Sequence, residues 1–211
     1  MDPSHIAELL RPFTGDVQLA PELLERLQRY LELLLKWNAR VNLTAVRGPE
    51  AIVARHFGES LFAARLLFPQ ARDRENVTMA DVGSGAGFPG VPVKLWAPHI
   101  ELTLIESQNK KAAFLREVLR TLKLDAAQVF CGRAEQWEHT ADTITLRAVE
   151  RFERALPVTA RLVRPGGRLC LLIGSNQLEP ARKLLGEWWK WDPPHRVPQS
   201  AERVVAIAHR A

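Results

Sequence analysis

The sequence predicts an α/β fold with a doubly wound, mostly parallel sheet, and three observations predict it. After residue 76, short apolar runs alternate with amphipathic helical segments, which is typical of βαβ units. The first of these runs leads directly into a glycine-rich loop, as in ligand-binding sheets of this class. The 211 residues, 46% of them hydrophobic, suffice for one domain with its own core.

The first third of the chain is predicted to be helical. Apolar residues recur at helical spacing over 4–10, 21–38 and 49–67. We therefore expect an N-terminal helical extension over residues 1–68, followed by the α/β domain over residues 69–211. The two parts are expected to form one compact unit.

The α/β domain is predicted to hold six strands and four helices. The strands are expected at 78–82, 101–105, 128–131, 142–146, 168–173 and 203–209. Helices are expected between them at 90–96, 109–124, 150–163 and 178–189. No helix is recognisable directly before the last strand, so that strand is expected to form an antiparallel edge.

The charge balance favours a polyanionic partner, because 29 Lys and Arg residues stand against 24 Asp and Glu. A basic surface that only maintains solubility explains it as well. Cys131 and Cys170 lie far apart without CxxC spacing, so we interpret both as reduced core residues and expect no metal site. No targeting segment or membrane span is visible, which predicts a cytoplasmic protein without membrane contact; a monomer is expected.

A glycine loop follows the first predicted strand. The residues are Gly83-Ser84-Gly85-Ala86-Gly87-Phe88-Pro89-Gly90, and glycine at such a turn lets a ligand approach the backbone. Residues 85–90 also match GxGxxG, so a dinucleotide site is a rival interpretation. A purely structural turn is a third one.

Two carboxylates flank this loop and bear on the choice of ligand. Glu106 ends the second strand and can accept both ribose hydroxyls of an adenosine, whichever cofactor carries it. Asp81 precedes the first glycine, where it would meet the amino-acid end of S-adenosylmethionine but repel a pyrophosphate. The pattern therefore favours S-adenosylmethionine over NAD.

Two later strand ends add candidates. After the third strand, Gly132-Arg133-Ala134-Glu135 occupies the position where this fold contacts an adenine, although Glu135 equally suits a helix start. Arg147 ends the fourth strand at the ligand edge of the sheet. No NPPY or DPPY segment is present and neither cysteine follows the fourth strand beside a proline, which excludes two nucleobase methylase types.

These residues belong to a longer pattern that resembles the ribosomal RNA small-subunit methyltransferase G family, also called glucose-inhibited division protein B. The resemblance covers nearly the whole chain in order. Its segments are 37–45 (WNARVNLTA), 55–61 (RHFGESL), 81–92 (DVGSGAGFPGVP), Glu106-Ser107 with Lys110-Lys111, 132–135 (GRAE) and 146–149 (LRAV). Two positions depart from the family pattern: Ile173 stands where a lysine is frequent, and Glu150 where a small residue is usual.

The resemblance implies a Rossmann-like class I fold that binds S-adenosylmethionine and makes 7-methylguanine in 16S ribosomal RNA or the small ribosomal subunit. It implies that the cofactor contacts are Gly83, Phe88, Ala134, Glu135 and Arg147, with Glu106 on the ribose; Asp81 and Gly85 complete the candidate site. Guanine N7 carries a lone pair and no proton, so positioning should supply most of the catalysis and no catalytic acid or base is named.

RNA contacts are expected from basic residues near this edge, although a solvated helix face explains each of them as well. The candidates are Arg55, His56, Lys110, Lys111 and Arg151, with Arg116, Arg147 and Arg154 as further possibilities. Trp188, Trp189 and Trp191 suit base stacking, or a helix packed on the sheet. The rival functions are a nicotinamide-dependent oxidoreductase and a nucleotide- or RNA-binding module without turnover.

Overall fold

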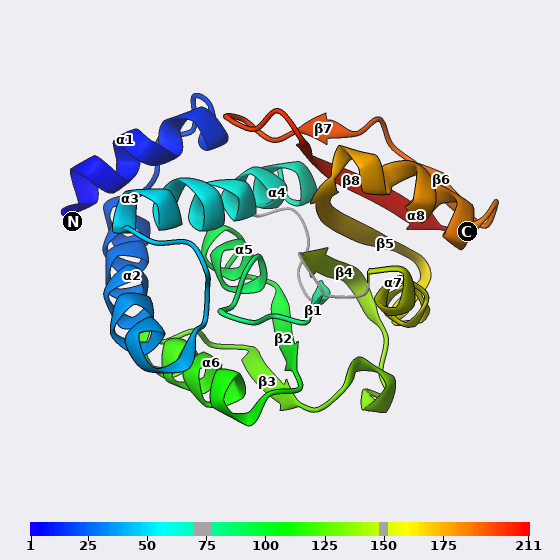
Figure 1. The fold of residues 1–211 in the computed structure, drawn as a ribbon, viewed down its shortest axis with the longest axis horizontal. Coiled ribbons are helices and arrows are strands. Elements are labelled where there is room, and N and C mark those ends of the chain that lie inside the picture. The colour runs from blue at the N-terminus through cyan, green and yellow to red at the C-terminus, as the bar shows by residue number, and fades with distance from the viewer. Residues whose placement is uncertain (70–76, 148–151) are drawn as a thin grey trace.

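The computed structural model describes residues 1–69, 77–147 and 152–211, and in these ranges an eight-stranded sheet lies between helices (Figure 1). The strand order is β3-β2-β1-β4-β5-β8-β6, and β7 also pairs with β8. The strands are β1 Thr78–Val82, β2 Glu101–Glu106, β3 Ala127–Cys131, β4 Ala141–Arg147, β5 Val163–Gly174, β6 Trp189–Trp191, β7 His195–Arg196 and β8 Arg203–Arg210.

The first five strands run parallel, and β8 runs antiparallel to β5. In that antiparallel pair Gly174 lies opposite Arg203 and Arg168 lies opposite His209. The antiparallel direction expected for the last strand is confirmed, but its place at the edge is wrong. The short strand β6 pairs with the other side of β8 and makes it an interior strand.

The strand residues alternate between two hydrophobic cores, because successive side chains of a strand point to opposite faces. In β5, Cys170 and Leu172 belong to one core, whereas Leu169, Leu171 and Ile173 belong to the other. Burial on both faces explains why these strands read as continuous apolar runs in the sequence.

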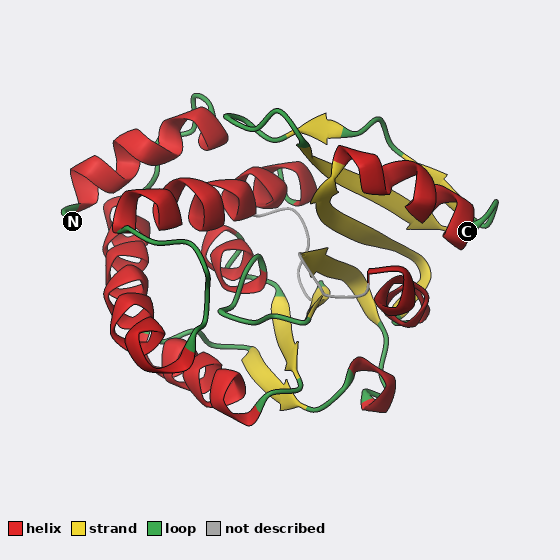
Figure 2. Ribbon diagram, in the orientation of Figure 1, coloured by secondary structure: helices red, strands yellow, loops and turns green. Residues whose placement is uncertain are grey.

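Helices cover both faces of the sheet (Figure 2). The helical extension packs with α5 and α6 on one core, and α7 and α8 pack on the other. The helices are α1 Pro3–Thr14, α2 Pro21–Val41, α3 Pro49–Ile52, α4 Glu59–Leu67, α5 Gly90–Trp96, α6 Asn109–Thr121, α7 Phe152–Arg161 and α8 Leu178–Leu185. The predicted helical first third and the alternating α/β pattern are both confirmed.

The segment expected as one helix over 49–67 is divided by a π-helical stretch. This stretch, η1, spans Val53–Gly58 between α3 and α4. π-Helical turns are rare and occur frequently at functional sites. The apolar periodicity of the segment did not reveal it, because a single wide turn shifts the spacing by only one residue.

Two further expectations are corrected. The helix expected over 178–189 ends at Leu185, because Gly186 adopts a φ of 69° and its N–H donates to the carbonyl of Arg182, which closes the last turn. Trp189 and Trp191 therefore lie on β6, and Trp188 is 79% exposed instead of packed under a helix. Cys170 is buried as expected, whereas Cys131 is exposed at the end of β3.

Candidate functional site

A cavity of about 840 Å³ opens at the carboxyl ends of the parallel strands. Ligands bind at this edge in open α/β sheets, and small-molecule sites measure roughly 300–1,000 Å³. Residues 43–59 of the helical extension form one wall, and the strand ends, the loops after them, α6 and the start of β8 form the rest. The lining residues are Leu43, Thr44, Ala45, Val46, Arg55, His56, Glu59, Gly83, Ser84, Gly85, Ala86, Phe88, Glu106, Gln108, Lys111, Arg147, Leu172, Ile173, Gly174, Gln177 and Arg203.

The glycine loop turns tightly out of β1. Gly83, Gly85 and Gly87 all have positive φ values, of 68°, 57° and 88°. The N–H groups of Gly83 and Ser84 donate to the carbonyl of Ile105, which fixes the loop onto β2. A Cβ at Gly85 would meet only the Gly83 carbonyl oxygen, at 3.8 Å, so the loop leaves open space beside its backbone.

Glu106 holds the loop from the cavity side. Its Oε2 accepts from the Gly85 N–H at 2.9 Å, and its Oε1 accepts from the Gln108 N–H at 2.8 Å. The residue is buried except where it lines the cavity. Each carboxylate oxygen has a second lone pair, so these bonds leave Glu106 able to accept from ligand hydroxyls.

Asp81 lies behind the loop and does not line the cavity. Its side chain is fully buried, where it accepts from the Thr145 hydroxyl at 2.7 Å and from the Gly90 N–H at 3.1 Å. Burial raises the pKa of Asp81 to about 6, although these hydrogen bonds act in the opposite direction. The structure thus gives Asp81 a role in holding the loop against β4.

Phe88 joins the loop to the helical extension through an aromatic stack. Its ring lies between His56 and Tyr30, with ring centroids 4.9 Å and 5.3 Å away. The Tyr30 hydroxyl, on α2, also donates to the carbonyl of Ala86. The extension therefore contacts both the backbone and the aromatic side chain of the loop.

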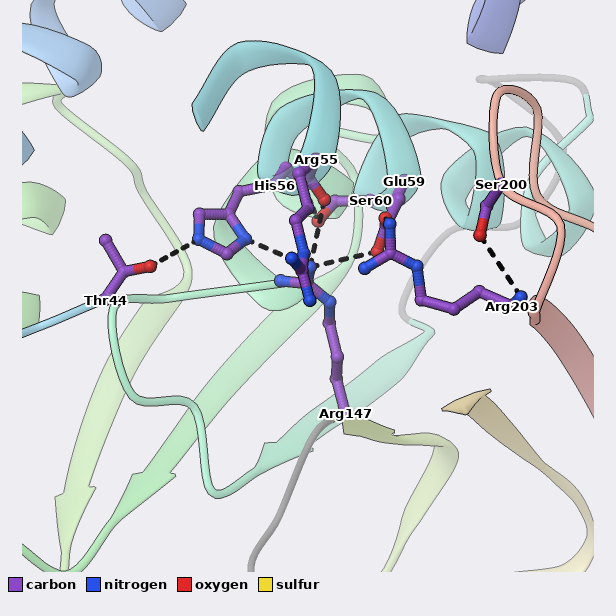
Figure 3. Close-up of polar contacts among 8 residues, drawn as sticks. All are labelled: Thr44, Arg55, His56, Glu59, Ser60, Arg147, Ser200 and Arg203. Atoms are coloured by element: carbon purple, nitrogen blue, oxygen red, sulfur yellow. Dashed lines mark hydrogen bonds and ion pairs between the residues drawn. The ribbon is translucent and has the colours of Figure 1, made fainter. Parts of the chain in front are cut away.

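Arg147 points from the end of β4 into the π-helical turn (Figure 3). Its Nη2 lies 2.9 Å from the Arg55 carbonyl, 3.0 Å from Nδ1 of His56 and 3.0 Å from Oε2 of Glu59. The other oxygen of Glu59 forms an ion pair with Arg203 from β8. One buried carboxylate thus joins the extension to two separate strands.

His56 is a neutral hydrogen-bond acceptor in this network. A guanidinium only donates, so Nδ1 of His56 must accept from Arg147, and Nε2 then donates to the Thr44 hydroxyl at 2.7 Å. Burial lowers the pKa of His56 to about 3, and the nearby arginines act in the same direction. His56 therefore lacks the positive charge for which it was selected as a phosphate contact.

The structure brings only part of the predicted set together. Of the candidates for cofactor contact, Gly83, Gly85, Phe88, Glu106 and Arg147 line the cavity; of those for RNA contact, Arg55, His56 and Lys111 line it. Ala134 and Glu135 form a 3₁₀ turn after β3 outside the lining, and Lys110 is exposed on α6. Arg151 and the unusual Glu150 lie outside the described residues.

Sequence reasoning missed Tyr30, Thr44, Glu59, Gln177 and Arg203. Glu59 carried a usable signal, since it lies in a mostly apolar segment between Phe57 and Leu61, and a carboxylate buried in such a segment needs a partner. Arg203 carried no signal, because only the sheet topology brings the start of β8 to the end of β5.

In the part of the chain that the structure describes, no group of three or more His, Cys, Asp or Glu side chains is placed to hold a metal ion. Within the same residues, every helix is too short or too polar to cross a membrane.

The strand order, the antiparallel β8 and the glycine-loop cavity define the class I fold of S-adenosylmethionine-dependent methyltransferases. The structure is similar to M. jannaschii TYW2 in complex with AdoMet, with a TM-score of 0.59 and 16% identity, covering 74% of this chain and 76% of that one. It is also similar to a SAM-dependent methyltransferase from Aquifex aeolicus, with a TM-score of 0.57 and 14% identity, covering 70% and 89%.

Residues 23–190 match the family of rRNA small subunit methyltransferase G, and the chain belongs to this family. It is 38% identical over 188 residues to the ribosomal RNA small subunit methyltransferase G of Xanthomonas campestris pv. campestris, covering 87% of this chain and 85% of the relative. The protein of that name from Xanthomonas oryzae pv. oryzae is 40% identical over 190 residues, covering 88% and 86%. The resemblance seen in the sequence is confirmed.

Proposed function

We propose that this methyltransferase transfers the methyl group of S-adenosylmethionine to N7 of a guanine in 16S ribosomal RNA, as free RNA or in the small subunit. Family membership over residues 23–190 supports the reaction class and the RNA substrate most directly. The likeness to structures of S-adenosylmethionine-dependent enzymes supports the cofactor. N7 as the acceptor atom rests on the resemblance to the family.

The cavity residues fit S-adenosylmethionine. The unobstructed backbone at Gly85 admits a ligand against the loop, and the Glu106 carboxylate beside it suits two ribose hydroxyls. The bound cofactor supplies an electrophilic sulfonium methyl group. Arg147 would act on its methionine end from the end of β4, and Asp81 would support the loop from behind through Gly90 and Thr145.

The residues of the chain position the reactants and do not need to move a proton. Guanine N7 attacks with a lone pair and carries no hydrogen, so no general base is required. His56, the histidine in the cavity lining, is held neutral by burial and by hydrogen bonds on both nitrogens. In-line placement at roughly 3–3.5 Å supplies about 7–11 kcal/mol of the barrier reduction.

The acceptor guanine is expected to be unpaired. N7 faces the deep, narrow groove of A-form RNA, which side chains do not reach. Transfer of labelled methyl from S-adenosylmethionine to 16S ribosomal RNA and to small subunits, both lacking the modification, followed by nucleoside analysis, tests the proposal. Label in 7-methylguanosine supports it; label in another nucleoside, or none, contradicts it.

Replacing Glu106 tests the assignment of the cofactor site. We expect Glu106→Ala to weaken S-adenosylhomocysteine binding by more than about tenfold, because the ribose hydroxyls lose a carboxyl acceptor. Calorimetric titration measures this change, and a titration with NAD should show no binding. Glu187→Ala, exposed in the turn before β6, is the matched control. Unchanged S-adenosylhomocysteine affinity in the Glu106 variant would remove this carboxylate from the cofactor site.

A further inference from the structure

The cavity extends well beyond the strands that carry the cofactor residues. Glu106 ends β2 and Arg203 begins β8, and the strands between them are β1, β4 and β5. Neighbouring strands lie about 4.8 Å apart, so four steps place these two backbone positions roughly 19 Å from each other. Both residues line the same cavity, which therefore has two halves along the sheet edge.

The first half contains the cofactor candidates at the ends of β2, β1 and β4. The second half is formed by the end of β5, the start of β8 and the π-helical turn above them. Its residues are Arg55, Leu172, Ile173, Gly174, Gln177 and Arg203. In the proposed reaction the acceptor nucleotide has to enter this second half.

The cavity carries more positive than negative charge. Arg55, Lys111, Arg147 and Arg203 line it, against the two carboxylates of Glu59 and Glu106. Glu59 divides its oxygens between Arg147 and Arg203, so neither arginine is neutralised by a carboxylate of its own. Neutral His56 adds nothing to the balance. The surplus of positive charge around Glu59 favours an anionic ligand.

Arg203 is the arginine of this pair that faces outward. Its side chain is 29% exposed, whereas that of Arg147 is 9% exposed and already contacts Arg55, His56 and Glu59. A guanidinium has five N–H donors in a planar fork, so contact with one oxygen of Glu59 leaves donors for a second anion. Glu59 thereby holds the Arg203 group in place without occupying all of it (Figure 3).

We propose that Arg203, oriented by Glu59 and assisted by the exposed Arg55, binds the phosphate of the acceptor nucleotide at the end of the cavity opposite Glu106. This inference rests on the proposed function. Arginine binds phosphate through two parallel hydrogen bonds, which fixes direction as well as distance. Arg203 is a positioning residue: it holds the nucleotide so that the base reaches the cofactor half.

The test compares RNA binding and cofactor binding in the same variants. For Arg203→Ala we expect RNA affinity to fall roughly tenfold or more, with a salt-dependence slope about one unit shallower. The KM for RNA should rise, Arg203→Lys should restore part of the affinity, and the dissociation constant for S-adenosylhomocysteine should stay at the wild-type value. Arg29→Ala is the matched control, because Arg29 is exposed on α2 and pairs only with Glu25 among the residues described.

Removing Arg203 leaves Glu59 with one partner, so folding is checked by thermal unfolding. If Arg203→Ala does not fold, Arg203→Lys and Arg55→Ala give the same comparison with the buried carboxylate still paired. An unchanged RNA affinity and salt slope would overturn the proposal, and so would a parallel loss of S-adenosylhomocysteine affinity. The methylation assay on the wild type tests the proposed function separately. Absence of methyl transfer would contradict that function, whereas differences in RNA binding between the variants would still be measurable.

Discussion

His56 gives the folded protein a particular sensitivity to acid. Its pKa is about 3 in the fold and near 6.5 in an unfolded chain. Since the folded pKa is depressed, the stabilising contribution is complete above pH 6.5 and is lost as the pH falls from 6.5 toward 3. The unfolding free energy falls by up to about 1.4 kcal/mol per pH unit, because His56 binds a proton in the unfolded chain but stays neutral in the fold.

We therefore expect the unfolding free energy of the wild type to fall more steeply than that of His56→Gln between pH 6.5 and pH 4. Urea unfolding of both proteins at a series of pH values measures the two unfolding free energies. Subtracting one from the other cancels the contributions of the titratable groups that both proteins share. His5→Gln is the control, because the hydrogen bond with Glu50 raises the pKa of His5 instead of lowering it. Parallel curves for wild type and His56→Gln would show that His56 is protonated as easily in the fold as outside it.

Alanine substitutions at two glycines of the loop, Gly85 and Gly87, should be harmful for different reasons. At Gly85 a Cβ meets only open space, so Gly85→Ala should cost about 1–2 kcal/mol in backbone strain and mainly obstruct the cofactor. At Gly87 a Cβ would collide with the Tyr30 hydroxyl and come within 2.9 Å of Val91, which adds roughly 1–3 kcal/mol of overpacking. Thermal unfolding and S-adenosylhomocysteine titration of both variants separate the two effects. Equal losses of stability would contradict this distinction.

At the scale of elements, α2 should stabilise the glycine loop through Tyr30. Tyr30→Phe keeps the stack on Phe88 but removes the hydroxyl that donates to the Ala86 carbonyl. A buried carbonyl without its donor costs about 1–3 kcal/mol. We expect a lower unfolding temperature that S-adenosylhomocysteine restores only in part, measured by thermal shift with and without the ligand. Full restoration would mean that the loop closes correctly without α2.

Sequence patterns predicted the elements well where a single periodicity governs them. β1 was predicted to the residue, and the other predicted strands overlap those observed, because buried parallel strands leave unmistakable apolar runs. The same patterns failed where one backbone angle decides the outcome. Gly186 ended a helix that the apolar spacing continued, and β6 appeared in its place.

The candidate site was predictable to the extent that its residues follow strand ends in one sheet. That rule located Glu106 and Arg147, the spacing of the glycines located the loop, and the family resemblance supplied the expected role of Arg147. Glu59 and Arg203 were not, because their proximity depends on a π-helical turn and on the insertion of β8 beside β5. Charge pairing across such distant segments leaves no local pattern in a sequence.

At the scale of the whole molecule, the extension and the sheet share one core. Ile6, Leu34 and Phe57 of the extension belong to the same buried cluster as Leu102 and Phe114 of the α/β domain. A fragment covering residues 69–211 would expose that face of the sheet to water. We expect it to lack cooperative thermal unfolding and to bind a hydrophobic dye, as measured by calorimetry and fluorescence. A cooperative transition in the fragment would show that residues 1–68 are dispensable for folding.

Because β8 is an interior strand from the end of the sequence, the sheet can be completed only late in synthesis. A ribosome synthesises the chain from the N-terminus, so β1 to β5 emerge before the strand that pairs with the open side of β5. Until residues 203–210 are available, the β5 edge remains exposed to other chains and Glu59 lacks its partner on β8. The second half of the cavity, which contains Arg203, is therefore completed last, and the glycine loop is synthesised well before it.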